Sequence, residues 1–340
     1  MTPKFKRCYI IAEIGVNHNG SMSLAKKLID RAKSSGADAV KFQTFKAERL
    51  TKKNTPKVAY QKRSGSKKET HFEMLKKLEL KEKDHILLKN YCHKKKIDFI
   101  STAYDVDSAM FLNKLGVKIF KTASADIVDH QMHKFLSKTG KHVIISTGMA
   151  TIDEINQVIK IYKNKKNFSL LHCTSNYPCS DKSINVKNLL TLKRKYKCIV
   201  GYSDHSVGNL ASITSIAYGA KIIEKHFTLS KKMKGPDHFA SITSRDLKNL
   251  VDDIRRTEKI LGSKIRKVQK EEMSMRNVSR KSLIYKTNLN SGHIVRDKDI
   301  TSIRPGTGML GNKIDIIIGK KIKKKVIKGS FVKVSDFEKK

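Results

Sequence analysis

The chain has 340 residues, of which 39% are hydrophobic and 30% are charged. This length exceeds that of one ordinary domain and suits a barrel of about 250 residues followed by a short second domain. No stretch approaches the roughly 18 consecutive apolar residues that a membrane-spanning helix requires, so the composition argues against a membrane protein. The formal net charge is +41, from 72 Lys and Arg against 31 Asp and Glu.

A net charge of this size by itself favours an anionic partner such as nucleic acid. The lysines, however, recur along the whole chain, as at Lys94–Lys96, Lys231–Lys232 and Lys323–Lys325. They form no aromatic-interleaved stripe, and no nucleic-acid motif accompanies them. We therefore predict solvated helix faces and loops and no nucleic-acid partner. A basic nucleic-acid-binding module stays as a remote alternative.

The first apolar run, Tyr9–Ile14, lacks the length and cleavage pattern of a signal peptide. We interpret it as the first strand of a cytoplasmic protein. The five cysteines are scattered and include no Cys-x-x-Cys pair, which predicts reduced thiols and neither a disulfide framework nor a zinc site. Cys173 is not expected to act in catalysis, because it follows His172 on a strand whose successive side chains face opposite ways.

Short β-branched or apolar runs alternate with amphipathic stretches, a pattern typical of βα units around a parallel sheet. Because there are eight such runs, and no Gly-x-Gly-x-x-Gly follows the first, we predict a closed (β/α)₈ TIM barrel. Helices are predicted between the runs, for example at Ser23–Ser35 and Asp153–Tyr162. The predicted strands are Tyr9–Glu13, Ala39–Gln43, Phe99–Thr102, Lys118–Lys121, Val143–Ser146, Ser169–His172, Ile199–Tyr202 and Lys221–Lys225.

Two parts of the chain depart from this alternation. A polar, lysine-rich insert from about Lys46 to Lys68 is predicted to form a long loop over the barrel mouth. After a last barrel helix at Arg245–Leu261, residues 263–280 are expected to be a linker between a barrel at 1–262 and a small β-rich domain at 281–340. The predicted strands of that domain are Ser282–Tyr285, His293–Val295, Thr301–Arg304, Lys320–Ile327 and Phe331–Val334.

Polar residues collect at the carboxyl ends of the predicted barrel strands, where such barrels assemble their active sites. Strand seven leads into Ser203-Asp204-His205, and strand eight carries Glu224-Lys225-His226. The other polar strand-end residues are Glu13, Lys41, Gln43, Thr102, Lys121, Ser124 and Ser146.

Two lysines lie in otherwise apolar strands, which costs desolvation unless a counter-charge is near. Lys41 and Lys121, with nearby serine hydroxyls, are suited to hold the phosphate of a dianionic ligand. The alternative is that both lysines are structural and pair with Glu13 or Glu224 inside the barrel.

Two histidines end adjacent strands, so that both imidazoles are able to reach one divalent ion. His205 and His226 are therefore candidate metal ligands, although hydrogen-bonded structural histidines are the commoner case at such positions. Asp237, in the turn Gly235-Pro236-Asp237-His238, is a candidate for sugar binding or for a base. Its alternative role is to stabilise the turn.

Several strings, in order along the barrel, resemble the bacterial sialic acid synthases, which include N-acetylneuraminate, legionaminic acid and pseudaminic acid synthases. A further string, Arg304-Pro305-Gly306-Thr307-Gly308, is similar to a loop of the antifreeze-like (SAF) domain of that family. The barrel strings are AEIGVNHNG at 12–20, GADAVKFQ at 36–43, STGM at 146–149, YSDHS at 202–206, EKHFTL at 224–229 and GPDH at 235–238.

The resemblance implies a barrel followed by an antifreeze-like domain, in a domain-swapped homodimer where each small domain covers the partner's active site. It implies that His205 and His226 bind the divalent metal, with Mn²⁺ expected first and Mg²⁺ or Co²⁺ as alternatives. It also implies that Arg304 reaches across the dimer to the N-acyl group of the sugar. Phosphoenolpyruvate would be held by Lys41, Lys121, Ser124, Ser146 and Ser203, with Thr102 beside them, and the sugar would face Glu13, Gln43, Tyr177 and Asp237.

Two positions depart from the family pattern. The common Lys-Ile-x-Ser-Gly-Glu reads Lys121-Thr122-Ala123-Ser124-Ala125-Asp126, so that the carboxylate of Asp126, expected to act in acid–base chemistry, is one methylene shorter. Ser175 stands where some relatives have Asn. The phosphate contact that the resemblance implies at this position would therefore be made by a serine hydroxyl here and by an asparagine amide in those relatives.

The implied reaction is a metal-dependent condensation of phosphoenolpyruvate with N-acetylmannosamine that releases phosphate without a Schiff base. The nearest competing function is that of a legionaminic or pseudaminic acid synthase acting on a 2,4-diacetamido-6-deoxy hexose. Two functions of different classes also stay open, namely the nucleic-acid-binding module and a barrel that has lost catalysis and serves as an interaction partner.

Overall fold

The computed structural model describes residues 5–58, 61, 69–163 and 167–338. The chain divides after Gly262 into two compact units, which are considered separately below. The stretch expected to link two domains contains the short helices η5 (Lys270–Glu272) and α12 (Met273–Ser279), and it is counted with the second unit. Among the described residues, no helix combines the length and apolar character needed to cross a membrane.

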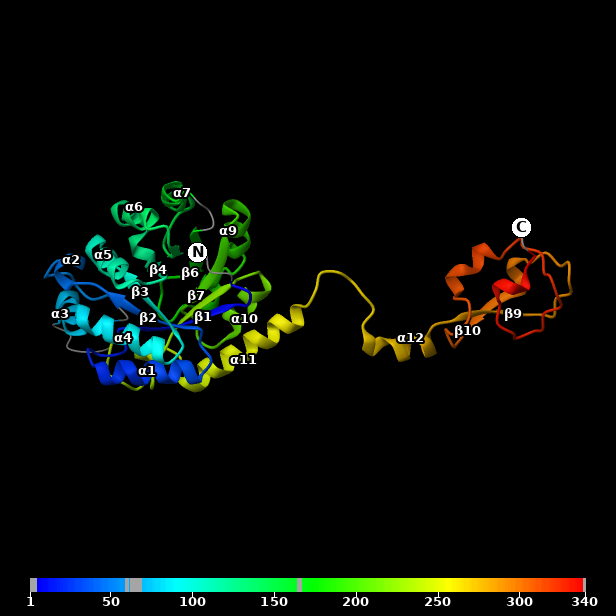
Figure 1. The fold of residues 1–340 in the computed structure, drawn as a ribbon, viewed down its shortest axis with the longest axis horizontal. Helices are drawn as coiled ribbons and strands as arrows, with labels where there is room; N and C mark the ends of the chain where they lie inside the picture. Colours follow the sequence, from blue (N-terminus) through cyan, green and yellow to red (C-terminus); the bar gives the residue numbers. More distant parts are fainter. Residues whose placement is uncertain (1–4, 59–60, 62–68, 164–166, 339–340) are drawn as a thin grey trace. The chain divides into compact units, whose positions relative to one another are not determined.

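The first unit is a closed barrel of eight parallel strands, each paired with its neighbours in sequence and the last paired with the first (Figure 1). This confirms the predicted (β/α)₈ architecture, and each strand lies within two residues of its predicted bounds. The strands are β1 Tyr9–Gly15, β2 Ala39–Thr44, β3 Asp98–Ala103, β4 Ile119–Thr122, β5 His142–Ser146, β6 Phe168–Cys173, β7 Ile199–Asp204 and β8 Ile222–His226.

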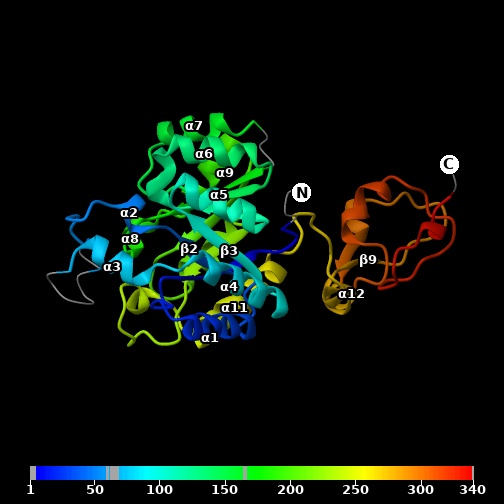
Figure 2. The same ribbon diagram turned by 60° about the vertical axis from the view of Figure 1, so that its left-hand side comes forward.

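Helices surround this barrel, as Figures 1 and 2 show from two directions. Several start at a Thr whose side chain and the acidic residue three positions later cap each other, for example Thr151 with Glu154 and Thr243 with Asp246. The helices are α1 Met22–Ser34, α2 Ala47–Leu50, α3 His71–Leu78, α4 Glu82–Lys94, α5 Val106–Leu115, η2 Ser124–Val128, α6 His130–Lys138, α7 Ile152–Ile161, α8 Asp181–Ile184, α9 Asn188–Tyr196, α10 Leu210–Ala217, η4 His238–Ala240 and α11 Ser244–Leu261.

The barrel interior has an apolar layer with a polar layer above it. Because strand side chains alternate in direction, the residue two positions after each inward apolar one also points inward. The apolar layer consists of Ile11, Ala39, Ile100, Ile119, Ile144, Leu171 and Ile222. The next inward residues, here named the polar floor, are Glu13, Lys41, Thr102, Lys121, Ser146, Cys173, Ser203 and Glu224, all of them buried.

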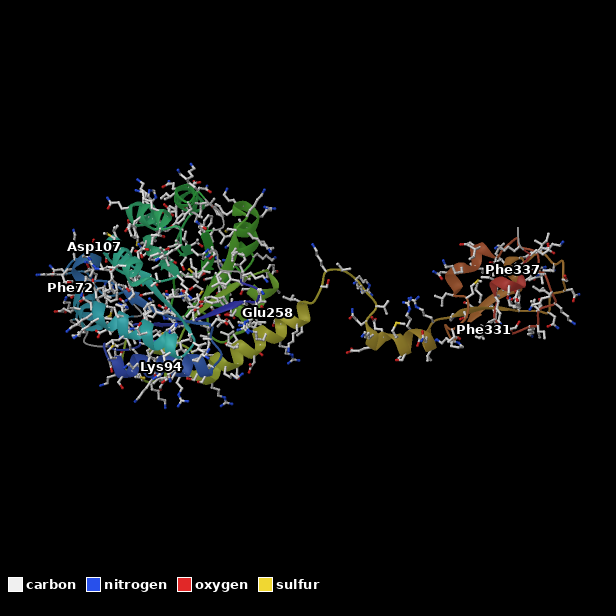
Figure 3. The ribbon with its side chains drawn as sticks, in the orientation of Figure 1. Phe72, Lys94, Asp107, Glu258, Phe331 and Phe337 are labelled. Carbon is white, nitrogen blue, oxygen red and sulfur yellow. The ribbon has the colours of Figure 1, made fainter. Side chains whose placement is uncertain are left out.

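The insert after β2 is partly helical. It contains α2 and leads into α3, and these two helices lie side by side in both ribbon views. The loop predicted from Lys46 to Lys68 falls in part outside the described residues. Side chains that end in nitrogen, among them the labelled Lys94, project around the outside of the barrel unit in Figure 3.

The second unit has less regular structure than the sequence predicts. Two antiparallel strands form, β9 Ser282–Tyr285 and β10 Ile300–Ile303. The strands predicted at His293–Val295, Lys320–Ile327 and Phe331–Val334 were wrong, because those segments contribute only isolated bridges such as Leu289 to Val326. Glycines with positive φ at 292, 319 and 329 turn the chain before any of these pairings extends. The unit has its own small apolar core.

Candidate active site

A cavity of about 390 Å³ lies at the carboxyl ends of the barrel strands, a size within the range of about 300–1,000 Å³ typical of small-molecule sites. Fourteen of the fifteen residues singled out from the sequence line it, and Arg304 does not. Those fourteen are Glu13, Lys41, Gln43, Thr102, Lys121, Ser124, Asp126, Ser146, Ser175, Tyr177, Ser203, His205, His226 and Asp237.

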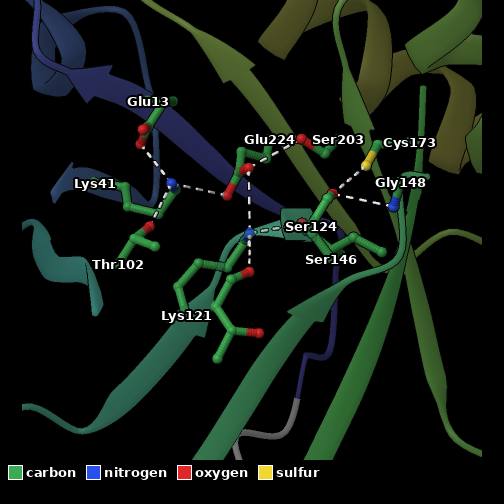
Figure 4. A network of polar contacts seen from close by, with 12 residues as sticks. Glu13, Lys41, Thr102, Lys121, Ser124, Ser146, Gly148, Cys173, Ser203 and Glu224 are labelled. Carbon is green, nitrogen blue, oxygen red and sulfur yellow. Dashed lines mark hydrogen bonds and ion pairs between the residues drawn. The ribbon is translucent and has the colours of Figure 1, made fainter. Parts of the chain in front are cut away.

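Two lysines and two glutamates of the polar floor form one charged network (Figure 4). Lys41 Nζ lies 2.8 Å from Glu13 Oε2 and 3.6 Å from Glu224 Oε2, and Lys121 Nζ lies 3.6 Å from Glu224 Oε1. The structural pairing considered for these lysines is therefore present. It does not exclude ligand binding, because both ammonium groups also line the cavity.

The network gives the carboxyl groups of Glu13 and Glu224 very different pKa values. Burial raises the pKa of Glu13 to about 7, against the opposing charge of Lys41. Burial acts in the same sense on Glu224, but the charges of Lys121 and Lys41 outweigh it and lower the pKa of Glu224 to about 2. Glu224 is therefore ionised at neutral pH, and its charge fixes the positions of both lysines. The sequence analysis treated Glu224 only as a counter-charge.

Hydroxyl groups complete the surroundings of the two ammonium groups. Lys41 Nζ donates to Thr102 Oγ1 at 2.9 Å, and Lys121 Nζ donates to Ser146 Oγ at 2.6 Å. Ser203 Oγ donates to Glu224 Oε1 at 2.9 Å. An ammonium group with several hydroxyl groups around it is the donor set that a phosphate group requires.

Gly148 leaves room for three further polar side chains. Its backbone N–H donates to Ser124 Oγ at 3.0 Å, and Ser124 Oγ lies 3.1 Å from Cys173 Sγ. A Cβ on Gly148 would lie 2.5 Å from Ser175 Oγ and 2.7 Å from Cys173 Sγ. Cys173 was missed as a site residue. Counting every second residue from the inward Leu171 would have found it.

The two strand-end histidines face the same part of the cavity. Their ring centroids are 5.7 Å apart, and the Tyr177 ring contacts both. His205 Nδ1 donates to the Thr174 carbonyl oxygen at 2.8 Å, so that its Nε2 carries the lone pair. His226 Nδ1 is buried, has no hydrogen-bond partner in the part of the chain that the structure describes, and lies 3.8 Å from Asp237 Oδ2.

These imidazoles suit a divalent metal. Burial lowers the pKa of His205, and it lowers the pKa of His226 to about 3, so both rings are neutral at pH 7 and have lone pairs available. An unpartnered buried ring nitrogen is costly unless a ligand satisfies it. No group of three or more His, Cys, Asp or Glu able to hold a metal occurs among the described residues. Two neutral imidazoles that leave the other coordination positions to water or substrate oxygens suit a divalent cation.

Asp237 is held by the loop after β1. Asn17 Nδ2 donates to the Phe227 carbonyl oxygen and to Ser241 Oγ, each at 2.9 Å, and Ser241 Oγ donates to the Asp237 carbonyl oxygen at 2.7 Å. His238 Nε2 lies 3.2 Å from Asn19 Oδ1. Burial raises the pKa of Asp237 to about 6.

Asp126 is a second carboxyl group with an elevated pKa. It lies in η2, directly after β4, and its Oδ2 is buried and accepts no hydrogen bond from any described residue. Burial raises its pKa to about 7, with a further contribution from the charge of Asp129. A carboxyl group with a pKa near neutrality is suited to proton transfer.

One wall of the cavity is apolar. It is formed by α3, together with residues that follow β1, β2 and β3. Sequence reasoning missed this wall, because the segment around α3 is rich in lysine and reads as a solvated loop. The apolar residues of the wall in these elements are Val16, Leu50, Met74, Leu75 and Leu78, with Tyr104 beside them.

Arg304 belongs to the second unit and is exposed. Its Nε donates to the Ser279 carbonyl oxygen at 3.0 Å. The role implied for Arg304 at the sugar therefore stays a prediction about the assembled protein.

Comparisons with known proteins identify relatives of this chain. The model of the NeuB family matches residues 28–266, and the model of the SAF domain matches residues 280–338. The N,N'-diacetyllegionaminic acid synthase of Legionella pneumophila is 43% identical, over 93% of this chain and 90% of that protein. The N-acetylneuraminate-9-phosphate synthase of Homo sapiens is 33% identical, over 93% of this chain and 88% of that protein.

Solved structures show the same fold. The N-acetylneuraminic acid synthetase of Leptospira borgpetersenii aligns with a TM-score of 0.71 and 37% identity, and the alignment covers 80% of this chain and 90% of that one. The barrel fold of this chain is therefore the fold of the relatives that its sequence matches.

Proposed function

Because the chain belongs to the NeuB family and carries a SAF domain, we propose that it condenses phosphoenolpyruvate with a 2,4-diacetamido-6-deoxy hexose and releases phosphate, as a legionaminic acid synthase. That it is a phosphoenolpyruvate-dependent nonulosonic acid synthase follows from the family itself. The acceptor sugar is the part that we propose.

The choice of acceptor rests on relatedness. The relative named for diacetyllegionaminic acid shares 43% identity with this chain, whereas the relative named for N-acetylneuraminate 9-phosphate shares 33%. N-acetylmannosamine, the acceptor expected first from the sequence, is therefore less well supported than the diacetamido sugar.

The proposed donor site is the lysine side of the cavity. Lys41 and Lys121 supply the positive charge for the carboxylate and phosphate of phosphoenolpyruvate, and Glu224 fixes their positions from below. Ser124, Ser146, Ser175 and Ser203 supply hydroxyl donors around the phosphate, with Thr102 bonded to Lys41. When the phosphate leaves, these donors stabilise the departing anion.

The proposed metal ligands are His205 and His226, whose neutral rings fit a divalent cation of the Mn²⁺, Mg²⁺ or Co²⁺ type. A cation bound there supplies the Lewis acidity that makes the aldehyde carbon of the open-chain sugar electrophilic. Tyr177 limits the space around both rings, and Asp237 lies beside His226 to orient the sugar.

The bond changes in this reaction balance. C3 of phosphoenolpyruvate forms a bond to the aldehyde carbon, and the aldehyde oxygen takes a proton. The electrons for the new carbon–carbon bond come from the C2–C3 π bond, which leaves C2 electron-deficient. Water adds at C2 and gives up its two protons, one of which balances the proton taken by the aldehyde oxygen, and phosphate leaves with cleavage of the C2–O bond as the added oxygen becomes the C2 carbonyl. We assign the proton exchanges to Glu13, Asp126 and Asp237, whose pKa values of about 7, about 7 and about 6 allow both protonation states near neutrality.

We further propose that the active protein is a homodimer in which the second unit of each chain reaches the cavity of its partner. The support is that fourteen expected site residues gather in one cavity of the barrel and Arg304 lies in the other unit. In this arrangement the guanidinium of Arg304 binds the N-acyl carbonyl of the sugar.

One observation carries the proposal: the two imidazoles and the two ammonium groups line the same cavity. The test is phosphate release by the purified enzyme with Mn²⁺, phosphoenolpyruvate and each of three acceptors, namely N-acetylmannosamine and the diacetamido sugars of legionaminic and pseudaminic acid synthesis. We expect the highest kcat/KM with the legionaminic precursor. Equal or faster turnover of N-acetylmannosamine would overturn the acceptor assignment.

A further inference from the structure

Helix α3 turns one face toward the cavity. His71, Met74, Leu75 and Leu78 all line the cavity, and their spacing of three, four and seven residues places them on a single face of the helix. Met74, Leu75 and Leu78 are 6%, 6% and 7% exposed. The lysines at 76 and 77 lie on the other side and pair with glutamates.

This face is firmly held. Thr70 and Glu73 form a capping box at the start of α3, and the backbone N–H of His71 donates to the Thr55 carbonyl oxygen at 2.9 Å. Met74, Leu75 and Leu78 pack in one apolar cluster with Phe45 and Ala47, and Phe45 packs edge-on against Tyr104 with ring centroids 5.9 Å apart. A wall on a capped helix with a packed backing presents a fixed shape to a ligand.

The apolar wall lies over a different part of the strand ring from the serines, Asp126 and the histidines, whereas Lys41 and Glu13 of the charged network come from β2 and β1, on the side of the wall. The serines, Asp126 and both histidines follow strands β4 to β8, whereas the wall follows β1, β2 and β3. In the proposed arrangement, phosphoenolpyruvate occupies the lysine side of the cavity and the aldehyde carbon of the acceptor sugar lies at the histidines. The other end of the sugar then points toward α3.

We propose that the α3 face selects acceptors that end in a 6-deoxy methyl group and carry a second acetamido group. Met74, Leu75 and Leu78 contact the methyl group, and the His71 ring hydrogen-bonds the amide of the second acetamido group. This inference rests on the proposed function, since it names the residues that would discriminate among acceptors of that reaction.

The apolar residues disfavour a hydroxymethyl group at this position. A hydroxyl group placed against the methionine and the two leucines loses water and gains no hydrogen bond. Apolar pockets discriminate on this basis by about tenfold to a hundredfold.

His71 contributes the polar part of the selection. Its side chain is half-buried, lines the cavity and makes no hydrogen bond with any residue that the structure describes. Burial lowers the pKa of His71, which keeps the ring neutral at pH 7. A neutral imidazole with one N–H and one lone pair matches an amide, which offers both an acceptor and a donor.

The test uses four acceptors that vary each feature separately: N-acetylmannosamine, its 6-deoxy analogue, its 4-acetamido analogue, and the sugar with both changes. With the full-length wild-type enzyme, Mn²⁺ and phosphoenolpyruvate, kcat/KM is measured for each. Met74→Gln, which keeps the size and helix propensity of the side chain, is expected to reduce the preference for 6-deoxy over 6-hydroxy acceptors about tenfold. Met74→Leu is expected to keep that preference.

The control is Lys77→Gln, which introduces the same residue on the outer side of α3, where Lys77 is 72% exposed. It is expected to leave all four values unchanged. If Met74→Gln does not fold, Leu50→Gln tests the same wall at a half-buried position. His71→Ala is expected to remove the preference for 4-acetamido acceptors and to spare the preference for 6-deoxy ones.

The outcomes separate the two proposals. No phosphate release by the wild-type enzyme with any acceptor defeats the proposed function. An active enzyme whose acceptor preferences are the same in Met74→Gln, Leu50→Gln and His71→Ala as in the wild type defeats the α3 inference alone, and shows that this face is only part of the core under the insert.

Discussion

At the scale of single residues, the polar floor follows from the alternation of side chains along a strand. The apolar run of a strand fixes which residues point inward, and on β1 to β5 and β8 the inward position two residues after the apolar layer is polar. Lys41 and Lys121 were predictable on this basis. Cys173 follows the same rule and was missed, because its place directly after His172 did not establish which of the two side chains points inward.

His226 provides the sharpest test at this scale. Because its Nδ1 has no hydrogen-bond partner among the described residues, His226→Ala removes the proposed metal ligand without breaking a hydrogen bond of that nitrogen. We expect kcat to fall at least about a hundredfold, with a thermal midpoint close to that of the wild type. The control is His93→Ala at an exposed position of α4. Near wild-type activity in His226→Ala, or in enzyme stripped of metal, would show that the imidazole pair does not serve catalysis.

Asp126 predicts a pH-dependent stability. Its pKa is raised from 3.8 to about 7 in the folded protein, so the folded state binds more protons than the unfolded state between these pH values. The stability that this group contributes is therefore fully present below about pH 4 and is lost as the pH rises through 7.

In Asp126→Asn the side chain is neutral at every pH, so the loss of stability between pH 4 and pH 7 does not occur. We expect the variant to match the wild type at pH 4 and to exceed it at pH 8 by about 1–3 kcal/mol, measured by calorimetry of the ligand-free enzyme at both pH values. A stability difference that stays constant across this range would mean that the carboxyl group is ionised throughout.

At the scale of elements, the loop after β1 and the turn after β8 act as one piece. Asn17 is completely buried and joins the two through Phe227 and Ser241. The motif that contains Asn17 was recognised in the sequence, but its role was not, because hydrogen bonds between residues more than 200 positions apart leave no local pattern.

Asn17→Ala tests this link. It leaves the buried Phe227 carbonyl and Ser241 hydroxyl without a donor, which we expect to destabilise the barrel by about 2 kcal/mol. Because Asp237 then loses its fixed position, we also expect the KM for the acceptor to rise about tenfold while the KM for phosphoenolpyruvate changes little. An equal effect on both KM values would indicate a general loss of structure.

The barrel elements were predictable from the sequence and the insert was not. The eight strands are buried runs whose composition leaves little choice of secondary structure. Helix α3 has its Met and Leu residues on one face and lysines on the other, but at eight residues it is short, and the polar insert before it conceals its start. In the second unit, the sequence pattern predicted strands at segments that form only single bridges. The glycine turns lie too close together along the chain for these pairings to extend into strands.

At the scale of the whole molecule, the proposed dimer places residues of one site on two chains. His226 lies in the barrel, and Arg304 lies in the second unit. If Arg304 acts on the partner's cavity, a heterodimer of Arg304→Ala and His226→Ala chains contains one intact site.

Coexpression of the two inactive variants with different affinity tags tests this arrangement. Heterodimers purified through both tags are expected to show about half of the wild-type activity per dimer, since one of two symmetry-related sites is complete. Each variant alone is expected to be inactive. Heterodimers as inactive as the parent variants would show that Arg304 does not act across subunits.

The apolar layer beneath the polar floor has a kinetic consequence. Seven packed hydrophobic side chains close the barrel from below, so that every molecule must enter and leave through the mouth beside α3. In the proposed arrangement, phosphoenolpyruvate bound to the lysines lies deeper in the cavity than the sugar, which then blocks its way out. We therefore expect phosphoenolpyruvate to bind before the sugar, and phosphate to leave only after the sugar acid has moved aside.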